Sequence, residues 1–130
     1  MKIIDGQDAV LGRLASYAAK EALNGETVII VNCEQIIISG NKKDIEEDFR
    51  AKKSKIGSGQ QGPKYSMTSE KIVKRAVRGM LPNHRRGRGK EAFKRVRCYV
   101  GIPKEFQETK KIVVGKESKI KSIKVKDILR

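Results

Sequence analysis

Residues 27–32, Thr-Val-Ile-Ile-Val-Asn, carry the clearest indication of how this chain folds. The four residues Val28–Val31 are all β-branched and apolar, and no polar residue alternates with them. This pattern is typical of a strand that is buried on both faces, as in a parallel sheet covered by helices. The sequence therefore predicts an α/β protein built around this strand.

The segments on either side of this strand continue the α/β pattern. Residues 2–5 predict a short buried strand, and the apolar stripe of residues 12–24 predicts a helix that ends at an Asn-Gly pair. Residues 36–38 are Ile-Ile-Ile and predict a further strand, after which Asn41 is expected to cap a second helix. Strands that alternate with helices indicate an α/β fold with right-handed crossovers.

Two basic segments interrupt this pattern in the second half of the chain. Residues 52–66 combine Gly, Ser, Gln and Pro with four lysines and predict a flexible cationic loop. Residues 68–81 predict a third helix, and residues 83–90, Asn-His-Arg-Arg-Gly-Arg-Gly-Lys, predict a second basic loop. A short helix over about 90–95 is then expected to lead into residues 96–100, the last strand of the sheet.

The C-terminal part of the chain carries weaker signals. Residues 104–130 are rich in lysine, with an edge strand expected at 122–126 and a helical turn after it. A length of 130 residues suits a single domain, 1–130, with a core over about 2–106 and a lysine-rich segment over about 107–130.

The basic residues are concentrated in one part of the chain. The formal net charge is +15, yet residues 1–50 carry 6 basic and 9 acidic side chains, a net of −3. Residues 51–95 carry 14 basic and 2 acidic side chains, a net of +12, and residues 96–130 carry a net of +6. A charge that served only solubility would not be segregated in this way, so we expect a face that binds a polyanion.

The cysteines, the single histidine and the lengths of the apolar segments limit which metal sites, disulfides and membrane spans the chain could form. Cys33 and Cys98 stand among apolar neighbours, and buried reduced thiols are favoured over a disulfide. A single histidine does not complete the usual zinc ligand sets, and no stretch approaches the roughly 20 apolar residues of a membrane span. The sequence therefore predicts a cytoplasmic protein without a metal, a cofactor, a membrane partner or a small-molecule substrate.

The predicted helix over 68–81 has two opposite faces. No acidic residue follows Glu70 on it, so its like charges repel one another unless a partner neutralises them. We interpret the basic face as a binding surface rather than a merely solvated one. The expected apolar face consists of Ile72, Val73, Ala76, Val77 and Met80, and the basic face of Lys71, Lys74, Arg75 and Arg78.

The loop after this helix strengthens the interpretation. Arginines alternate with Gly87 and Gly89, and glycine lets a backbone approach a sugar–phosphate chain while guanidinium groups bind phosphate oxygens in pairs. The alternative is a disordered basic linker. His84 could stack on a base, although a loop histidine without special role is favoured. The chain shows no recognisable helix-turn-helix, zinc-finger or basic-zipper pattern, and aromatic residues are only 5% of it, so structured RNA is favoured over DNA and single strands.

Residues 57–62, Gly-Ser-Gly-Gln-Gln-Gly, match the pattern G-x-G-x-x-G of dinucleotide sites. The expected preceding strand is missing, Pro63 follows directly, and Tyr65 replaces the hydroxyl residue that a P-loop needs for magnesium. A nucleotide-binding α/β enzyme therefore stays the alternative function, and a membrane-surface protein is a further rival that would need more bulky aromatic residues.

Several segments together resemble one known family. These segments are Ile3–Gly6 with Val10–Ser16, Val31–Glu34 with Ile38–Lys42, Ala76–Pro82 with the basic loop after it, and Tyr99–Pro103. They are similar to the L-thirteen family of large-subunit ribosomal proteins, and the archaeal branch fits best because the chain is short. The resemblance covers about residues 2–106.

This resemblance implies a three-layer α/β/α fold with a mainly parallel, about four-stranded sheet. It also implies a structural, non-enzymatic role: binding of large-subunit ribosomal RNA, contact with neighbouring large-subunit ribosomal proteins, and support of subunit assembly and translation. The family's RNA-contacting helix and loop correspond here to Arg75, Arg78, Gly79, Arg85, Arg86 and Arg88.

Lys52–Lys64 and Asn83–Lys90 are expected to be two cationic arms whose order depends on RNA. The full set of residues predicted to bind RNA is Lys52, Lys53, Lys55, Lys64, Lys71, Lys74, Arg75, Arg78, Gly79, Arg85, Arg86, Arg88, Lys90, Lys94 and Arg95.

Overall fold

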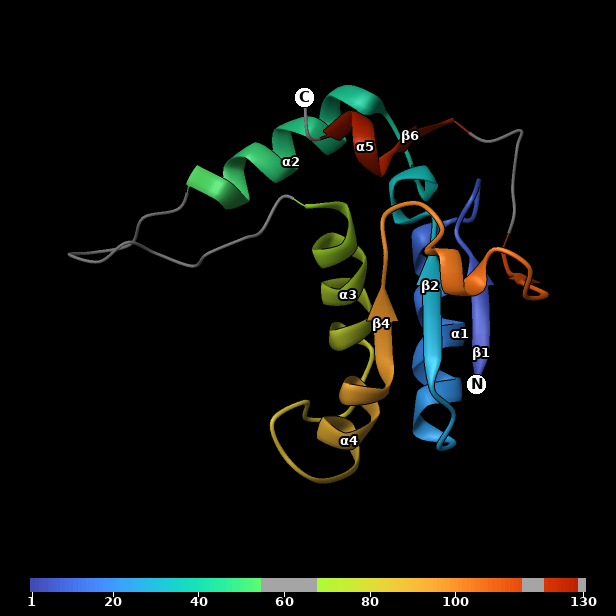
Figure 1. The fold of residues 1–130 in the computed structure, drawn as a ribbon. Coiled ribbons are helices and arrows are strands. Elements are labelled where there is room, and N and C mark those ends of the chain that lie inside the picture. Colours follow the sequence, from blue (N-terminus) through green and yellow to red (C-terminus); the bar gives the residue numbers. More distant parts are fainter. Residues whose placement is uncertain (55–67, 116–120, 129–130) are drawn as a thin grey trace.

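The computed structural model describes residues 1–54, 68–115 and 121–128 (Figure 1). The predicted Gly-rich motif at 57–62 and the predicted RNA-binding residues Lys55 and Lys64 lie outside these ranges, as does the side chain of Lys53.

A four-stranded, fully parallel sheet forms the centre of the molecule, in the order β4-β2-β1-β5. Every residue of β2 is buried, which confirms the prediction made from its unbroken apolar run. Burial of each such side chain contributes about 1.5–3 kcal/mol to folding. The strands are β1 (Lys2–Asp5), β2 (Val28–Val31), β4 (Val96–Cys98) and β5 (Ile112–Val113).

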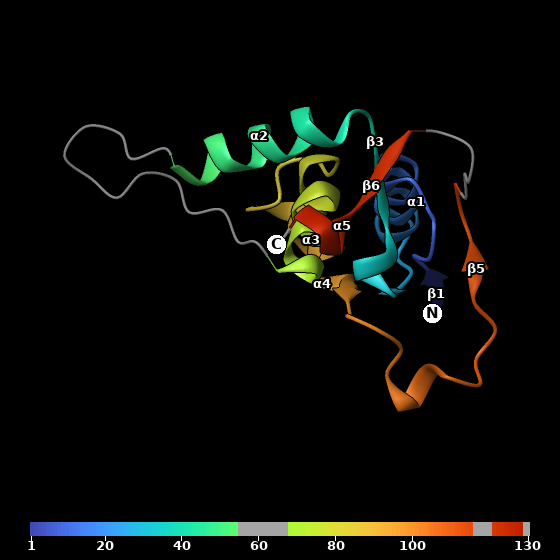
Figure 2. The ribbon, with the colours of Figure 1, turned by 90° about the horizontal axis from the view of Figure 1, so that it is seen from above.

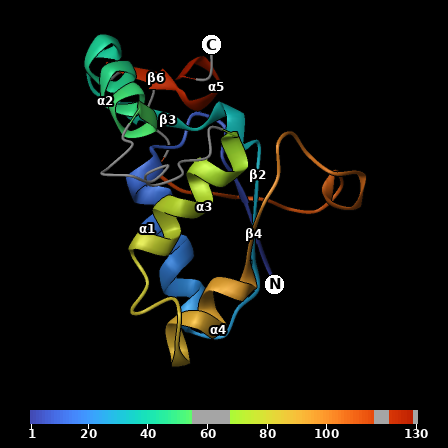
Figure 3. The ribbon, with the colours of Figure 1, turned by 90° about the vertical axis from the view of Figure 1, so that its left-hand side faces the viewer.

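Three helices cover one face of this sheet (Figures 1 and 2). The apolar stripe of α1 is buried through Leu14, Ala15 and Ala18, as the helical spacing predicted. Figure 3 shows α1 and α3 side by side, with α4 across one end of the pair. The three helices are α1 (Leu11–Leu23), α3 (Ser69–Gly79) and α4 (Gly87–Arg95).

The opposite face of the sheet is covered by a shorter segment. Ile3, Ile29 and Val31 point to this side and pack with Phe106 of the 3₁₀ helix η2 (Lys104–Phe106). Figure 2 shows η2 on the side of the sheet away from α1 and α3. The sheet thus lies between two covering layers, which confirms the expected three-layer, mainly parallel α/β fold.

Two expectations about the strands need correction. Residues 96–100 do not form the last strand of the sheet, because β5 adds to the free edge of β1. The strand expected at 36–38 forms as β3 (Ile37–Ser39), but it pairs antiparallel with β6 (Ser122–Lys124) in a separate sheet. The physical reason lies just before β3, where Asn32 has a left-handed φ of 57° and the 3₁₀ helix η1 (Cys33–Gln35) turns the chain out of the main sheet.

The C-terminal segment behaves as its pattern indicated. The strand β6 is followed directly by the short helix α5 (Val125–Ile128), which confirms the expected edge strand and helical turn. α5 packs against η1 and α3 and also against α2 (Lys42–Ser54), so the C-terminal segment lies at the end of the molecule opposite the N-terminus (Figure 1).

Two helices extend into segments that were expected to be loops. α2 continues to Ser54, so Lys52 lies on a helix. α4 begins at Gly87 rather than near residue 90, so Arg88 and Lys90 are helical as well. The start of α4 is held by close packing, because a Cβ atom on Gly89 would lie only 1.6 Å from the carbonyl oxygen of Pro82.

This packing gives a first prediction. We expect Gly89→Ala to lower the free energy of unfolding by about 1–3 kcal/mol or more, because the new methyl group must displace the Pro82–Asn83 backbone. Urea unfolding of the RNA-free protein measures the change. Gly12→Ala, whose new methyl group would meet nothing within 4 Å on α1, is the control and should be neutral or stabilising by up to about 1 kcal/mol. Equal stability of the two variants would contradict the close-packing argument.

Candidate nucleic-acid interface

Helix α3 presents opposite faces to the core and to the surface. Ile72, Val73 and Val77 are buried against α1 and the sheet, whereas Lys71 and Arg75 are exposed. Lys74 and Arg78 are half-buried. The back-to-back arrangement predicted from the sequence is confirmed for these residues.

One residue of the expected apolar face is wrongly assigned. Met80 is 43% exposed, because α3 ends at Gly79 and Met80 is its C-cap rather than a helical position. Its sulfur accepts a hydrogen bond from the Ser16 hydroxyl at 3.4 Å, and the following Leu81 is the residue that enters the core.

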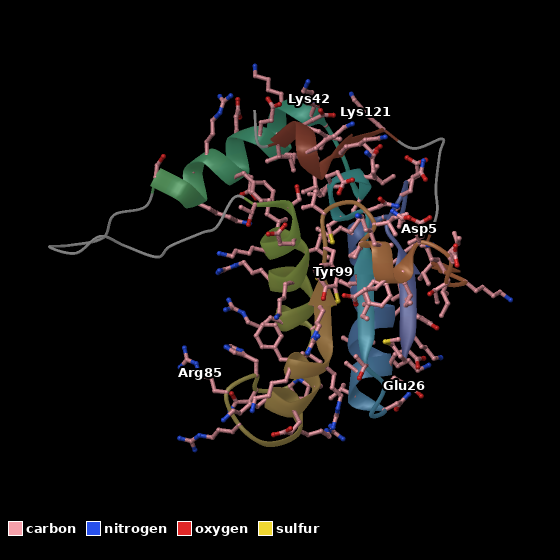
Figure 4. The ribbon with its side chains drawn as sticks, viewed as in Figure 1. Asp5, Glu26, Lys42, Arg85, Tyr99 and Lys121 are labelled. Carbon is pink, nitrogen blue, oxygen red and sulfur yellow. The ribbon has the colours of Figure 1, made fainter. Side chains whose placement is uncertain are left out.

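The connection between α3 and α4 is an organised turn. The Asn83 side-chain oxygen accepts a hydrogen bond from the backbone N–H of Arg85 at 3.2 Å, and the Asn83 carbonyl accepts one from Arg86 at 3.3 Å. Figure 4 shows Arg85 on the outer side of this turn, pointing away from the sheet. Arg85, Arg86, Arg88 and Lys90 are all exposed. The turn therefore presents a compact group of cations next to the basic face of α3.

Phe93 links the two basic helices. The Lys74 ammonium lies 4.9 Å from the centroid of the Phe93 ring, close enough for a cation–π contact, and His84 meets the same ring edge-on at 6.2 Å. Phe93 of α4 thus contacts both α3 and the turn that joins the two helices. This packing is consistent with a structural His84 and gives no sign of base stacking.

Arg95 and Lys52 are predicted RNA-binding residues that also have partners inside the protein. The Arg95 guanidinium donates a hydrogen bond of 2.9 Å to the Ala22 carbonyl at the C-terminal end of α1, where a positive charge is favourable. The Lys52 ammonium lies 3.1 Å from Asp48 and 5.5 Å from the centroid of the Phe49 ring. Contact of these two side chains with RNA stays a prediction.

Arg97 is not among the residues predicted from the sequence to bind RNA. This exposed residue lies on β4, the edge strand of the sheet, where a hollow of about 320 Å³ opens between β4 and α3. The sequence did contain a signal for it, a basic residue between Val96 and Cys98 in the predicted strand. Side chains alternate between the two faces of a strand, so a basic residue between two apolar ones is expected on the exposed face. The hollow is lined by Glu70, Lys71, Lys74, Arg97, Cys98 and Tyr99.

The carboxyl ends of the strands, where many α/β enzymes bind nucleotides, are occupied by a hydrogen-bonded network. Asp5 accepts bonds from the Asn32 side chain at 2.9 Å and from the Gln7 backbone at 3.0 Å, and Figure 4 shows Asp5 at this end of the sheet. Glu34 accepts a bond of 2.9 Å from the Gly101 N–H. Carboxylates placed here repel phosphate, so this edge disfavours the alternative of a nucleotide-binding enzyme.

Both cysteines are free thiols, and they neighbour each other although 64 residues separate them. Cys33 is buried, as expected, whereas Cys98 is only half-buried. A hydrogen bond with the Cys98 thiol and burial both raise the pKa of the Cys33 thiol far above its ordinary value. Cys33 is therefore protonated and unreactive at neutral pH.

Fold and surface together define a small α/β protein with one segregated cationic surface. Residues 1–105 match the family described as "Ribosomal protein L13". The chain is 47% identical over 106 residues to the "Large ribosomal subunit protein uL13" of Natronomonas pharaonis, an alignment that covers 82% of this chain and 72% of that protein. It is 44% identical over 115 residues to the protein of the same name from Methanocaldococcus jannaschii, covering 86% of this chain and 83% of that protein. The chain belongs to the ribosomal protein L13 family.

Family membership confirms the resemblance found in the sequence, including its archaeal branch. The relatives carry the names of ribosomal proteins and not of enzymes, which confirms a non-enzymatic protein with a cytoplasmic, ribosomal location. Among the described residues, no helix is long and apolar enough to cross a membrane.

The contact of Arg95 with α1 gives a second prediction. We expect Arg95→Ala to lower the free energy of unfolding by about 1–2 kcal/mol, because a charge-assisted hydrogen bond to the Ala22 carbonyl is lost. Lys94→Ala, which removes the adjacent exposed charge, should change stability by less than about 0.5 kcal/mol. Urea unfolding compares them, and equal losses would refute a structural role for Arg95.

Proposed function

We propose that this protein is a structural component of the large ribosomal subunit that binds its ribosomal RNA through one cationic surface. This surface, called the α3–α4 surface below, consists of the basic residues of α3, the turn after it and α4. The protein would contact neighbouring large-subunit ribosomal proteins and support subunit assembly and translation. The observation that carries the proposal is the position of these cations on elements whose other faces form the core.

Five cations of the α3–α4 surface have no ion-pair partner in the part of the chain that the structure describes. Within the described residues, the side chains of Arg78, Arg85, Arg86, Arg88 and Lys90 form no ion pair. Rigid placement of like charges costs free energy in the isolated protein, and a polyanion that binds there recovers this cost. RNA phosphates supply such charges at regular spacing.

Gly79 provides independent support for a close partner. It is exposed near the C-terminal end of α3, and a Cβ atom added to it would meet nothing within 4 Å. Its φ is not in the left-handed region, so neither the backbone nor the packing of this protein requires glycine there. Glycine inside a helix costs about 1 kcal/mol relative to alanine, and close approach of an RNA backbone explains why that cost is tolerated.

Lys52–Lys64 and Asn83–Lys90 were expected to become ordered only when RNA binds. The structure describes the second arm in full but only the start of the first. Asn83–Lys90 forms a hydrogen-bonded turn and the first turn of α4, so its conformation is supported by the protein itself. In the first arm, Lys52 lies on α2, and residues 55–64 fall outside the described ranges. Dependence of order on RNA stays a prediction, which hydrogen exchange with and without RNA can test.

The arginines of the turn give the third prediction. We expect the triple change Arg85→Ala, Arg86→Ala and Arg88→Ala to weaken binding to large-subunit ribosomal RNA while leaving the melting temperature nearly unchanged. For about 6–10 neutralised phosphates, log affinity of the wild type should fall against log salt with a slope of magnitude about 4–9, and the variant should lose about 2–3 of that slope. Filter binding over a salt series measures both quantities.

A charge-matched control separates a specific surface from net charge. The triple change Lys42→Ala, Lys43→Ala and Lys126→Ala also removes three exposed positive charges, far from the turn. Equal effects of the two triple changes on the salt slope would leave only non-specific attraction and would refute the proposed surface.

Gly79 gives the fourth prediction. We expect Gly79→Ala to raise the free energy of unfolding of the free protein by about 0.5–1 kcal/mol while lowering RNA affinity, because the methyl group stabilises the helix but obstructs the RNA. Urea unfolding and RNA binding are measured on the same preparation. Gly12→Ala on α1 is the matched helical control, expected to keep full RNA affinity. Unchanged affinity of Gly79→Ala would show that RNA does not approach this position.

A further inference from the structure

The hollow between α3 and β4 is positively charged and adjoins the α3–α4 surface. Lys71, Lys74 and Arg97 supply three positive charges to its lining, and Glu70 supplies one negative charge. Lys71 and Lys74 belong at the same time to the basic face of α3. A chain of phosphates that follows α3 therefore reaches this hollow without leaving cationic surface.

The walls of the hollow are rigid. One side is α3, whose Ile72, Val73 and Val77 are held in the core. The other side is β4, which forms the edge of the sheet and pairs with β2 through Val96, Arg97 and Cys98. The volume of about 320 Å³ lies at the lower end of the range for small-molecule sites. Rigid walls of that size suit one small anionic group better than a peptide or a helix.

We propose that this hollow is a second binding subsite, which holds one phosphodiester group of the ribosomal RNA and extends the interface from α3 to the edge of the sheet. Arg97 is its main ligand, because a guanidinium group binds two phosphate oxygens at once. Lys71 and Lys74 add charge from the other wall. This inference rests on the proposed function and adds a position that the L-thirteen resemblance and the sequence pattern did not identify.

Cys98 makes the subsite measurable. Cys98 is half-buried and is one of the residues that line the hollow, so a phosphodiester bound there would restrict access to it. The neighbouring Cys33 is 0% exposed and serves as an internal control for folding. Iodoacetamide reports on both residues, because a thiolate sulfur attacks its methylene carbon, a sulfur–carbon bond forms and iodide leaves.

The experiment follows alkylation of the full-length protein by mass spectrometry, with RNA binding measured in the same samples. We expect saturating large-subunit ribosomal RNA to slow alkylation of Cys98 at least tenfold, with Cys33 unmodified throughout. Arg97→Gln should lower RNA affinity, and at RNA concentrations that still saturate the α3–α4 surface the protection of Cys98 should fall below about twofold. Arg97→Lys should recover part of the protection.

Each other result has a definite meaning. If Cys98 reacts equally fast with and without bound RNA, or if Arg97→Gln keeps full protection, the subsite is refuted and the proposed function stands. If the wild type binds no RNA, the proposed function fails and the subsite with it.

If inorganic phosphate at the concentration of RNA phosphate protects Cys98 as well as RNA does, the ligand is a free anion and the RNA assignment is overturned. If alkylation of Cys33 reveals that Arg97→Gln is unfolded, Arg97→Met, which keeps the aliphatic part of the side chain without its charge, replaces it with the same expected loss of protection.

Discussion

The pairing of β2 with both β1 and β4 is the constraint on which the rest of the structure depends. Val28 and Ile30 face the helices, while Ile29 and Val31 face the η2 segment, so this strand contributes to both apolar clusters. Because all four residues are apolar, alternation does not specify the register of β2. The register is set at its end, where Asn32 donates to Asp5 and takes the left-handed conformation that turns the chain away.

This central strand also determines where the positive charge is held. β4 pairs with β2, and α3 packs on the face that they share with α1. The basic side of α3 consequently points away from the core. The Lys74–Phe93 contact then aligns α4 with α3, and the turn cations lie beside those of α3. This packing holds like charges close together, which raises the free energy of the free protein. It also places those charges where a polyanion can bind them without rearrangement.

The segments that resemble the L-thirteen family divide into two physical roles. Residues 31–34 and 99–103 bond to each other: the Asn32 N–H donates to the Gly101 carbonyl at 2.9 Å, and the Cys33 N–H donates to the Tyr99 carbonyl at 3.2 Å. These segments hold the carboxyl ends of β2 and β4 together. Residues 76–82 instead end α3 at the exposed Gly79 and start the cationic turn. The segments that resemble the family therefore include both residues that hold the strands together and residues proposed to contact RNA. The structure shows which segment has which role.

Local periodicity and charge were enough to predict the buried strand at 28–31, the helix over 12–24, the two faces of α3 and the concentration of positive charge after residue 50. Tertiary structure alone decided the features that depend on partners distant along the chain. A three-residue apolar run at 36–38 predicts a strand but cannot specify that β6, more than 80 residues later, is its partner. In the same way, Arg95 differs from Lys94 only because the Ala22 carbonyl lies beside it, and Arg97 gains its significance only where β4 meets α3. The periodicity of apolar residues indicates which side of a helix or strand faces the core. Strand pairing and side-chain partners depend on contacts between residues far apart in the sequence, so they are known only from the folded structure.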